Sequence, residues 1–172
     1  MRSRFGRERR RATAEGPASS RPEEEAKRAV EHALRALSRR GLTASELRTR
    51  LVDRGFADVA VEAALGRIAE LGYLDDAAIA DAVVREASRA HHGTRRIART
   101  LARRGVAANV AEEAVRDRRD EDLASARAFV AKRFPGGVRG DVRERARALR
   151  MLFSRGFSHD VARLAIGVDL DD

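Results

Sequence analysis

Two pairs of adjacent side chains are the first places where this sequence could carry chemistry. Asp75 and Asp76 form a paired carboxylate, and His91 and His92 are two potential metal ligands. Adjacent residues on a helix point about 100° apart, so the two imidazoles cannot coordinate the same metal ion. Acidic residues at a helix start usually cap its free N–H groups and complement its dipole. We therefore interpret Asp75 and Asp76 as a helix start, and His91 and His92 as a polar helix end.

The sequence lacks the other patterns that catalysis or cofactor binding would need. It contains no Gly-rich phosphate loop with Lys and Ser/Thr, no dinucleotide fingerprint, no HExxH motif and no cysteine. We expect a protein that is not an enzyme, with no catalytic residues, no cofactor and no metal site. An enzyme that uses Asp75 and Asp76 is kept as an alternative, and it would require a turnover activity that is lost when they are mutated.

A run of arginines offers a different chemistry, the binding of anions. Between Thr94 and Arg104 the sequence has no acidic residue. At about 100° per residue, four arginines fall within roughly a 100° arc, while Ile97 and Leu101 lie opposite. This cationic stripe suits nucleic-acid phosphates or an acidic protein surface. The alternative is an ordinary solvated face in an Arg-rich protein. The stripe consists of Arg95, Arg96, Arg99 and Arg103.

A second arginine-rich segment follows about fifty residues later in the sequence. It repeats the theme of the cationic stripe, but Asp141 and Glu144 dilute its charge. We expect it to be the counterpart of the stripe in the last third of the chain. Its arginines are Arg143, Arg145, Arg147 and Arg150.

The elements that would position these residues repeat along the chain. The phrase Arg-Gly-apolar occurs three times, with a leucine four residues before each glycine. A period of about fifty residues indicates repeated units stacked into an array, which is typical of binding surfaces. Glycine suits the left-handed position that ends a helix, so we interpret the phrase as a helix end followed by a core residue. The three copies are Arg54-Gly55-Phe56, Arg104-Gly105-Val106 and Arg155-Gly156-Phe157.

Apolar residues at three- and four-residue spacing predict helices from Glu23 onward, and no run alternates with the period of a strand. Thr43 with Glu46 predicts a capping box, and we expect Thr94 to cap a later helix. Asp141 with Glu144 is another possible capping box. The predicted fold is all-α, with three tandem three-helix repeats in an elongated, curved array. The expected divisions are a disordered basic leader (1–22), repeat 1 (23–72), repeat 2 (73–119), repeat 3 (120–168) and an acidic tail (169–172).

The charge of the chain favours acidic partners. Its formal net charge is +9, and more than half of this excess lies in residues 1–22, where seven arginines face Glu8 and Glu15. Such a leader can hold polyanions loosely or simply improve solubility. No apolar run approaches the roughly 18 residues of a membrane span, and the start of the chain lacks the apolar core of a secretory signal. With no cysteine, the cytoplasm is the expected compartment, and we expect no membrane partner.

Three segments in order resemble the RecX family, bacterial regulators of the RecA recombinase. The resemblance covers about Ala26 to Ile166. This sequence departs from the family pattern at two places: Ile79 stands where an aromatic residue is usual, and His91-His92 precede Gly93 where a basic residue is common. The matching residues are Leu71-Gly72-Tyr73-Leu74-Asp75-Asp76 with Ala80, then Gly93, Ile97, Leu101 and Arg104-Gly105-Val106, and finally Arg155-Gly156-Phe157-Ser158 with Asp160-Val161.

The resemblance implies a non-enzymatic modulator built from three-helix repeats. Family members bind along the groove of the RecA–DNA filament and restrain its ATPase, strand-exchange and co-protease activities. We expect a monomer that meets single- or double-stranded DNA directly or through the filament. From charge geometry alone, we expect partner contacts from Arg95, Arg96, Arg99, Arg103, Arg104, Arg147 and Arg150. The motif residues expected to be mainly structural are Gly55, Gly72, Tyr73, Asp75, Asp76, Gly105, Gly156 and Phe157.

One rival reading of the sequence is a helical DNA-binding protein that acts alone. Three-helix units with a Gly turn can mimic helix-turn-helix geometry, and a sequence pI near 11.3 fits DNA binding. A salt-sensitive interaction with bare DNA, and none with the recombinase, would favour this alternative.

Overall fold

The computed structural model describes residues 20–138 and 141–167, and within these ranges every regular element is an α-helix. The expected all-α fold of three three-helix units is confirmed. The expected acidic tail and all but the last residues of the expected leader lie outside the described ranges. The helices are α1 (Ser20–Leu37), α2 (Ala44–Val52), α3 (Asp58–Glu70), α4 (Asp76–Arg89), α5 (Thr94–Arg103), α6 (Ala108–Val115), α7 (Arg118–Arg133), α8 (Val142–Ser154) and α9 (His159–Ala165).

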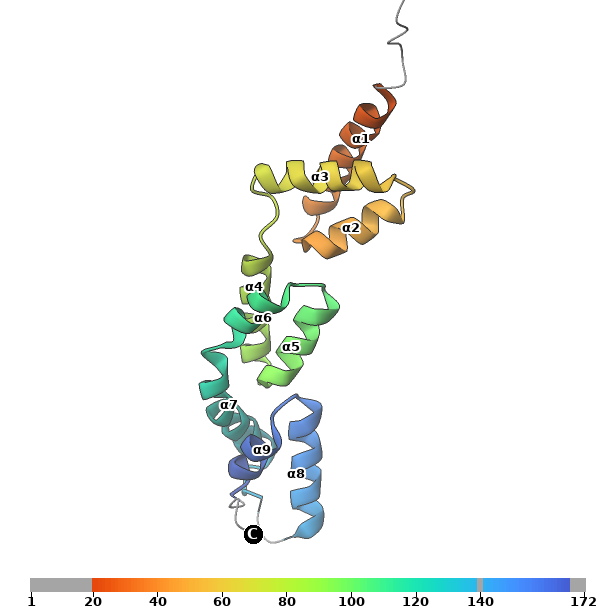
Figure 1. The fold of residues 1–172 in the computed structure, drawn as a ribbon. Helices are drawn as coiled ribbons and strands as arrows, with labels where there is room; N and C mark the ends of the chain where they lie inside the picture. The colour runs from red at the N-terminus through yellow and green to blue at the C-terminus, as the bar shows by residue number, and fades with distance from the viewer. Residues whose placement is uncertain (1–19, 139–140, 168–172) are drawn as a thin grey trace, which may run out of the picture.

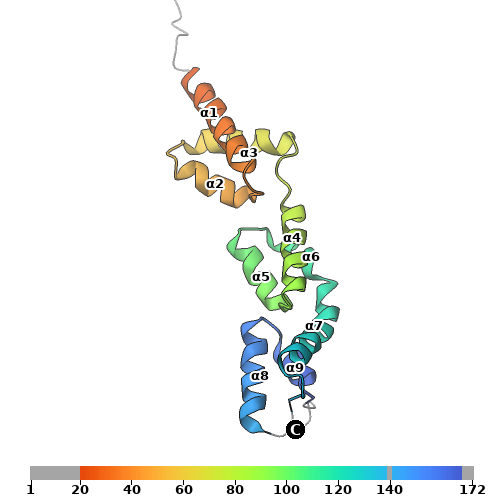
Figure 2. The same cartoon turned by 180° about the vertical axis from the view of Figure 1, so that it is seen from behind.

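The three units follow one another in a row, each with a separate small core (Figures 1 and 2). The first core joins α1, α2 and α3, the second joins α4, α5 and α6, and the third joins α7, α8 and α9. Within each unit the first and third helices pack together. Alanine, leucine and valine supply most of the buried side chains, and small cores of this kind suit units that depend on their neighbours. The arrangement leaves long helical surfaces exposed along the row.

Local side-chain caps set the starts of α2, α4, α8 and α9. At α2 the Thr43 hydroxyl accepts a hydrogen bond from the Glu46 N–H, and the Glu46 carboxylate accepts one from the Thr43 N–H, which is the predicted capping box. Asp75 caps α4 by accepting from the Ala78 N–H at 2.8 Å. Each such cap satisfies a donor that a helix start would otherwise leave unpaired.

Two predicted caps were wrong in detail. Gly93, not Thr94, is the N-cap of α5. Thr94 instead donates its backbone N–H to the carboxylate of Asp122 from α7. At α8, Asp141 is the N-cap and accepts from the Arg143 N–H at 2.9 Å, two residues on, so its bond is not that of a capping box. Thr94 differs from the prediction because Asp122, from the neighbouring repeat, accepts the hydrogen bond from the N–H at this helix start.

The repeated Arg-Gly-apolar phrase forms the same helix end in each unit. Gly55, Gly105 and Gly156 have φ values of +84°, +71° and +89°, which L side chains rarely adopt. The N–H of the following apolar residue donates to the carbonyl of the leucine five residues back, for example Phe56 to Leu51 at 3.3 Å. This is the Schellman arrangement, and it explains why the phrase needs glycine.

Candidate interaction surface

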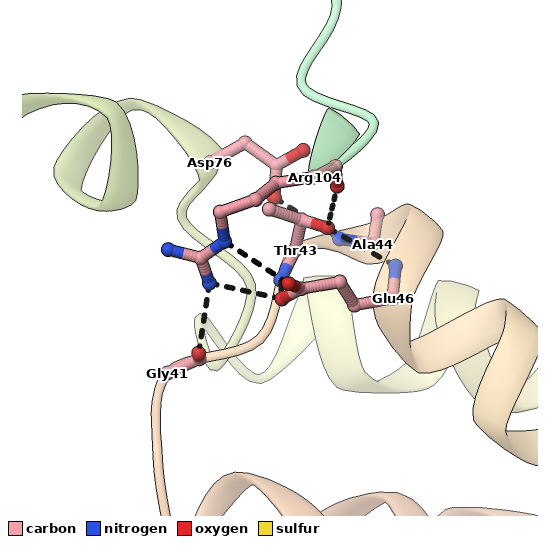
Figure 3. Close-up of polar contacts among 6 residues, drawn as sticks. All are labelled: Gly41, Thr43, Ala44, Glu46, Asp76 and Arg104. Carbon is pink, nitrogen blue, oxygen red and sulfur yellow. Dashed lines mark hydrogen bonds and ion pairs between the residues drawn. The ribbon is translucent and has the colours of Figure 1, made fainter. Parts of the chain in front are cut away.

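Arg104, at the end of α5, is held by repeat 1. Its guanidinium donates to both carboxylate oxygens of Glu46, from Nε at 3.0 Å and from Nη2 at 2.9 Å. Nη2 also donates to the Gly41 carbonyl at 3.2 Å, and the Thr43 hydroxyl donates to the Arg104 carbonyl at 2.6 Å (Figure 3). About three quarters of each charged side chain in this pair is shielded from solvent. Arg104 therefore serves the junction between repeats 1 and 2.

Glu46 has two tasks at this junction. It completes the capping box of α2 and accepts the two bonds from Arg104. The hydrogen bond from Arg104 is the largest cause that lowers the pKa of Glu46, and the same bond raises the pKa of Arg104. Asp76 adds a second link, since its carboxylate accepts from the Ala44 N–H at 3.0 Å. Of the paired acids, Asp75 therefore caps its own helix, and Asp76 caps a helix of the preceding repeat.

The junction between repeats 2 and 3 uses equivalent positions. The Gly93 N–H donates to the Arg155 carbonyl at 2.9 Å, and the Arg95 N–H donates to the Gly156 carbonyl at 3.2 Å. The Arg155 guanidinium donates to the Ala90 carbonyl at 2.7 Å and lies 4.0 Å from the centre of the Phe129 ring. At both junctions, the start of the middle helix meets the Arg-Gly turn that ends the next repeat's middle helix.

The backbones approach closely at this second junction. A Cβ atom added to Gly93 would lie 2.5 Å from the Gly156 carbonyl oxygen, and one added to Gly156 would lie 2.4 Å from the Arg96 N and Cβ atoms. Asp122 is the equivalent of Asp76 at the first junction. Asp76 accepts a hydrogen bond from the Ala44 N–H at the start of α2, and Asp122 accepts one from the Thr94 N–H at the start of α5. Burial raises the pKa of Asp122, an effect that the bond from Thr94 opposes. Glycine at positions 93 and 156 is therefore a packing requirement.

The cationic stripe lies between these two junctions. Ile97 and Leu101 are buried at 1% and 0% exposure, so α5 turns its other face to solvent, as its periodicity predicts. No acidic residue occurs within α5. The exposed side chains of the stripe are Arg95, Arg96, Arg99 and Arg103.

Two hollows lie beside the stripe, where α5 meets the end of α8 in repeat 3. Arg95 and Arg99 line one of about 460 Å³ together with Phe153 of α8. Arg99 and Arg103 line another of about 630 Å³, which Ser154 also borders. Arg96 borders the second hollow and donates from Nη1 to the Ser154 carbonyl at 3.2 Å. The stripe and the end of α8 together form one cationic surface with cavities large enough for side chains or phosphates.

The remaining predicted contact residues lie elsewhere. Arg147 and Arg150 are exposed on α8, but they line neither hollow beside α5. Phe153 was missed by sequence reasoning, although it is 38% exposed at the hollow and stacks on His159 with ring centres 5.5 Å apart. The signal in the sequence that could have found Phe153 is its position next to the core residue Leu152, because adjacent residues on a helix point in different directions. Tyr73 is also exposed, just past the Gly72 turn, whose φ is +73°.

The described residues contain neither a metal-ligand cluster nor a helix that could span a membrane. Within residues 20–138 and 141–167, no cluster of three or more His, Asp or Glu side chains could hold a metal ion. The same ranges contain no helix long and apolar enough to cross a membrane.

Burial lowers the pKa of His92, with smaller contributions from the charges of Arg96 and Arg155.

Comparison with known proteins finds the same three-unit organisation. Family models described as the first, second and third three-helix domains of RecX match residues 22–67, 75–115 and 120–166. A Regulatory protein RecX of Halorhodospira halophila is 40% identical over 141 residues, which cover 81% of this chain and 88% of the relative. One from Thermus thermophilus is 38% identical over 135 residues, covering 78% and 87%. The crystal structure of RecX from Lactobacillus salivarius superposes with a TM-score of 0.73 at 19% identity, over 84% of this chain and 96% of that one, and supports the fold alone.

Proposed function

The chain belongs to the RecX family of regulatory proteins, and on this premise we propose that it is a negative modulator of the RecA recombinase. It binds in the groove of the RecA–DNA filament and restrains the ATPase, strand-exchange and co-protease activities. It acts in the cytoplasm as a monomer and catalyses no reaction of its own. The DNA of the filament, single- or double-stranded, is its second partner, met directly or through RecA.

The observation that carries this proposal is the uncompensated cationic stripe on α5. Its four arginines are exposed, and the helix that carries them contains no acidic residue. Arginines with no acidic partner on their own surface favour an acidic protein face or a phosphate backbone. Arg95, Arg99 and Arg103 have no hydrogen bond or ion pair through their side chains within the described ranges, which leaves them available to a partner.

The elongated row of repeats suits a filament as the partner. A groove on a helical filament is long, and repeated units joined in register can follow it. The two junctions fix that register through Arg104 and Arg155, which bind the preceding repeat. We therefore assign Arg104 a positioning role in addition to the partner contact expected from its charge. Arg147 and Arg150 stay candidates for contact at the far end of the row.

A RecA–single-stranded-DNA ATPase assay tests the proposal. Titrating the protein into preformed filaments is expected to lower the ATPase rate with a saturating dependence on protein concentration. An unchanged rate at concentrations well above that of RecA would contradict it. A salt-sensitive shift of bare DNA in the absence of any effect on filaments would instead favour the alternative, a stand-alone DNA-binding protein.

A further inference from the structure

Arg54 is the first copy of the arginine that closes each junction, and no repeat precedes it in the described part of the chain. Arg104 binds the Glu46 carboxylate, and Arg155 binds the Ala90 carbonyl. Within residues 20–138 and 141–167, the Arg54 side chain makes no hydrogen bond or ion pair. A position that meets an oxygen acceptor in the other two repeats is therefore open to an acceptor from another molecule.

Arg54 borders a hollow of about 220 Å³ between α1 and α2, in the unit that forms one end of the row (Figure 1). Ala36 and Leu51 form its apolar floor, at 7% and 1% exposure. We call this cavity the repeat-1 hollow. Its polar lining consists of His32, Arg35, Arg39, Arg50 and Arg54.

Helical spacing brings these side chains together. His32, Arg35 and Arg39 lie three and four residues apart, which places them along one face of α1 and the turn that follows it. Arg50 lies in the last turn of α2, and Arg54, four residues on, lies in the turn that follows it. Both sets line the same cavity, which lies where α1 and α2 meet.

The charge of the repeat-1 hollow is almost uncompensated. None of the residues that line it is acidic. Arg35 faces Glu31 at 3.8 Å, but both side chains are more than 60% exposed, and such pairs contribute little. Arg39, Arg50 and Arg54 have no ion pair within the described ranges. Four guanidinium groups around one cavity repel one another, so the site favours an anion between them.

The chemistry of the lining favours phosphate. Guanidinium groups match phosphate oxygens with paired N–H donors, and a backbone phosphate carries its charge without any dependence on base sequence. The floor is apolar and offers no side-chain group that could read a base edge. A second cationic surface, the stripe on α5, lies in the next repeat.

We propose that the repeat-1 hollow is a nucleic-acid phosphate site, in which Arg39, Arg50 and Arg54 bind the backbone of a DNA strand. Arg35 also contributes to phosphate binding, although its guanidinium is paired with Glu31. The site is separate from the cationic stripe, and it rests on the direct contact with DNA named in the proposed function. Because dT12 binding is measured without RecA, its failure is distinguishable from a failure to restrain the filament ATPase.

His32 provides a local reporter for this site. Its ring lines the hollow and packs edge-on against Phe56, with ring centres 5.4 Å apart. In histidine-selective NMR of the full chain at fixed pH, a dT12 oligonucleotide is expected to move the His32 ring signals in a saturable way. Unmoved His32 signals at saturating oligonucleotide would overturn the proposal.

Two further probes separate the sources of negative charge. Pyrophosphate and an oligoglutamate peptide are added at the same total concentration of anionic groups as the oligonucleotide. Each is expected to move His32 less, with at least a tenfold weaker affinity. Equal affinity for pyrophosphate would overturn the assignment to a nucleic-acid backbone. Equal affinity for oligoglutamate would overturn the assignment to phosphate.

A charge-matched pair of variants completes the test. Arg39→Gln with Arg54→Gln is expected to weaken dT12 binding about tenfold and to reduce the slope of log affinity against log salt by about 1.4, since each of the two single-strand phosphate contacts contributes about 0.7. The control is Arg28→Gln with Arg85→Gln, which removes two exposed arginines that line no part of the hollow. Equal losses in the two double variants would overturn the proposal. Circular dichroism confirms that both remain folded.

Discussion

The guanidinium of Arg104 donates two hydrogen bonds to the carboxylate of Glu46, at 3.0 and 2.9 Å, across 58 residues of sequence. Through this pair the last turn of α5 is fixed to the first turn of α2, so the ionic contact and the capping box share one carboxylate. The arginine that recurs before each glycine is therefore a junction residue in repeat 2, as Arg155 is in repeat 3.

The Arg104–Glu46 pair is expected to contribute measurably to stability. In a double-mutant cycle with Arg104→Gln and Glu46→Gln, we expect a coupling energy of about 1–2 kcal/mol, because charged hydrogen bonds are strong but these side chains keep some contact with solvent. Urea unfolding followed by circular dichroism measures it. Arg103→Gln, one residue earlier and exposed, serves as the control and should change stability by less than about 0.5 kcal/mol. A coupling energy near zero would show that the junction does not depend on this pair.

The same pair predicts a dependence of stability on pH. The folded-state pKa of Glu46 is lowered from its ordinary 4.5, chiefly by the hydrogen bond from Arg104. A carboxylate with a lowered folded-state pKa stabilises the fold fully above its unfolded value and loses that contribution as pH falls through the folded value. The stability difference between the wild type and Glu46→Gln should therefore be present at pH 7 and shrink below about pH 4.5. Asp122, whose pKa shifts the other way, is common to both proteins and cancels. A difference that grows as the pH falls would contradict this.

Two glycines with similar backbone angles should respond differently to alanine. Gly55→Ala is expected to cost about 1–2 kcal/mol, because φ is +84° but nothing lies within 4 Å of the added Cβ. Gly156→Ala has the same backbone penalty, and its Cβ would also lie 2.4 Å from Arg96, which adds roughly 1–3 kcal/mol of overpacking. Thermal unfolding of the two variants compares them directly. A cost at position 156 no larger than at position 55 would contradict the close packing of repeats 2 and 3.

Phe153 is expected to contribute to partner binding more than to folding. It is exposed at the hollow that Arg95 and Arg99 line. Phe153→Ala should weaken filament binding about three- to tenfold, since an aromatic side chain at an interface commonly contributes more than 1 kcal/mol. Binding is measured by fluorescence anisotropy of labelled RecA–DNA filaments. Val142→Ala, which truncates a 78% exposed side chain on the same helix, should leave the affinity unchanged. Equal effects of the two variants on filament binding would show that Phe153 is not part of the partner-binding surface.

The fold could be predicted from the sequence because its signals are local. The spacing of apolar residues indicated the helices, and the Thr43 and Glu46 capping box lies within four residues. The junctions could not be predicted in this way, because they depend on which turn meets which helix start. Thr94 was misread for this reason. The cap of α5 is Gly93, which the backbone of repeat 3 approaches too closely for any side chain, and Asp122 satisfies the Thr94 N–H from another repeat.

The candidate surface could be predicted only in part. Charge and helical period identified the stripe on α5, whose arginines are exposed as expected. Neither signal distinguishes an arginine held by a neighbouring repeat, such as Arg104, from one left free. The repeat-1 hollow was missed because its arginines come from two helices, and only their packing shows that Arg39 and Arg54 line one cavity.

The central claim is that the cationic stripe carries the restraint of RecA, and one comparison in the ATPase assay tests it most directly. The triple variant Arg95→Gln, Arg99→Gln and Arg103→Gln is compared with the charge-matched variant Arg28→Gln, Arg85→Gln and Arg127→Gln, whose arginines are exposed on α1, α4 and α7. The stripe variant is expected to need at least tenfold more protein for half-maximal inhibition, while the control stays within about twofold of the wild type. Inhibition by the folded stripe variant at the wild-type concentration would contradict the account.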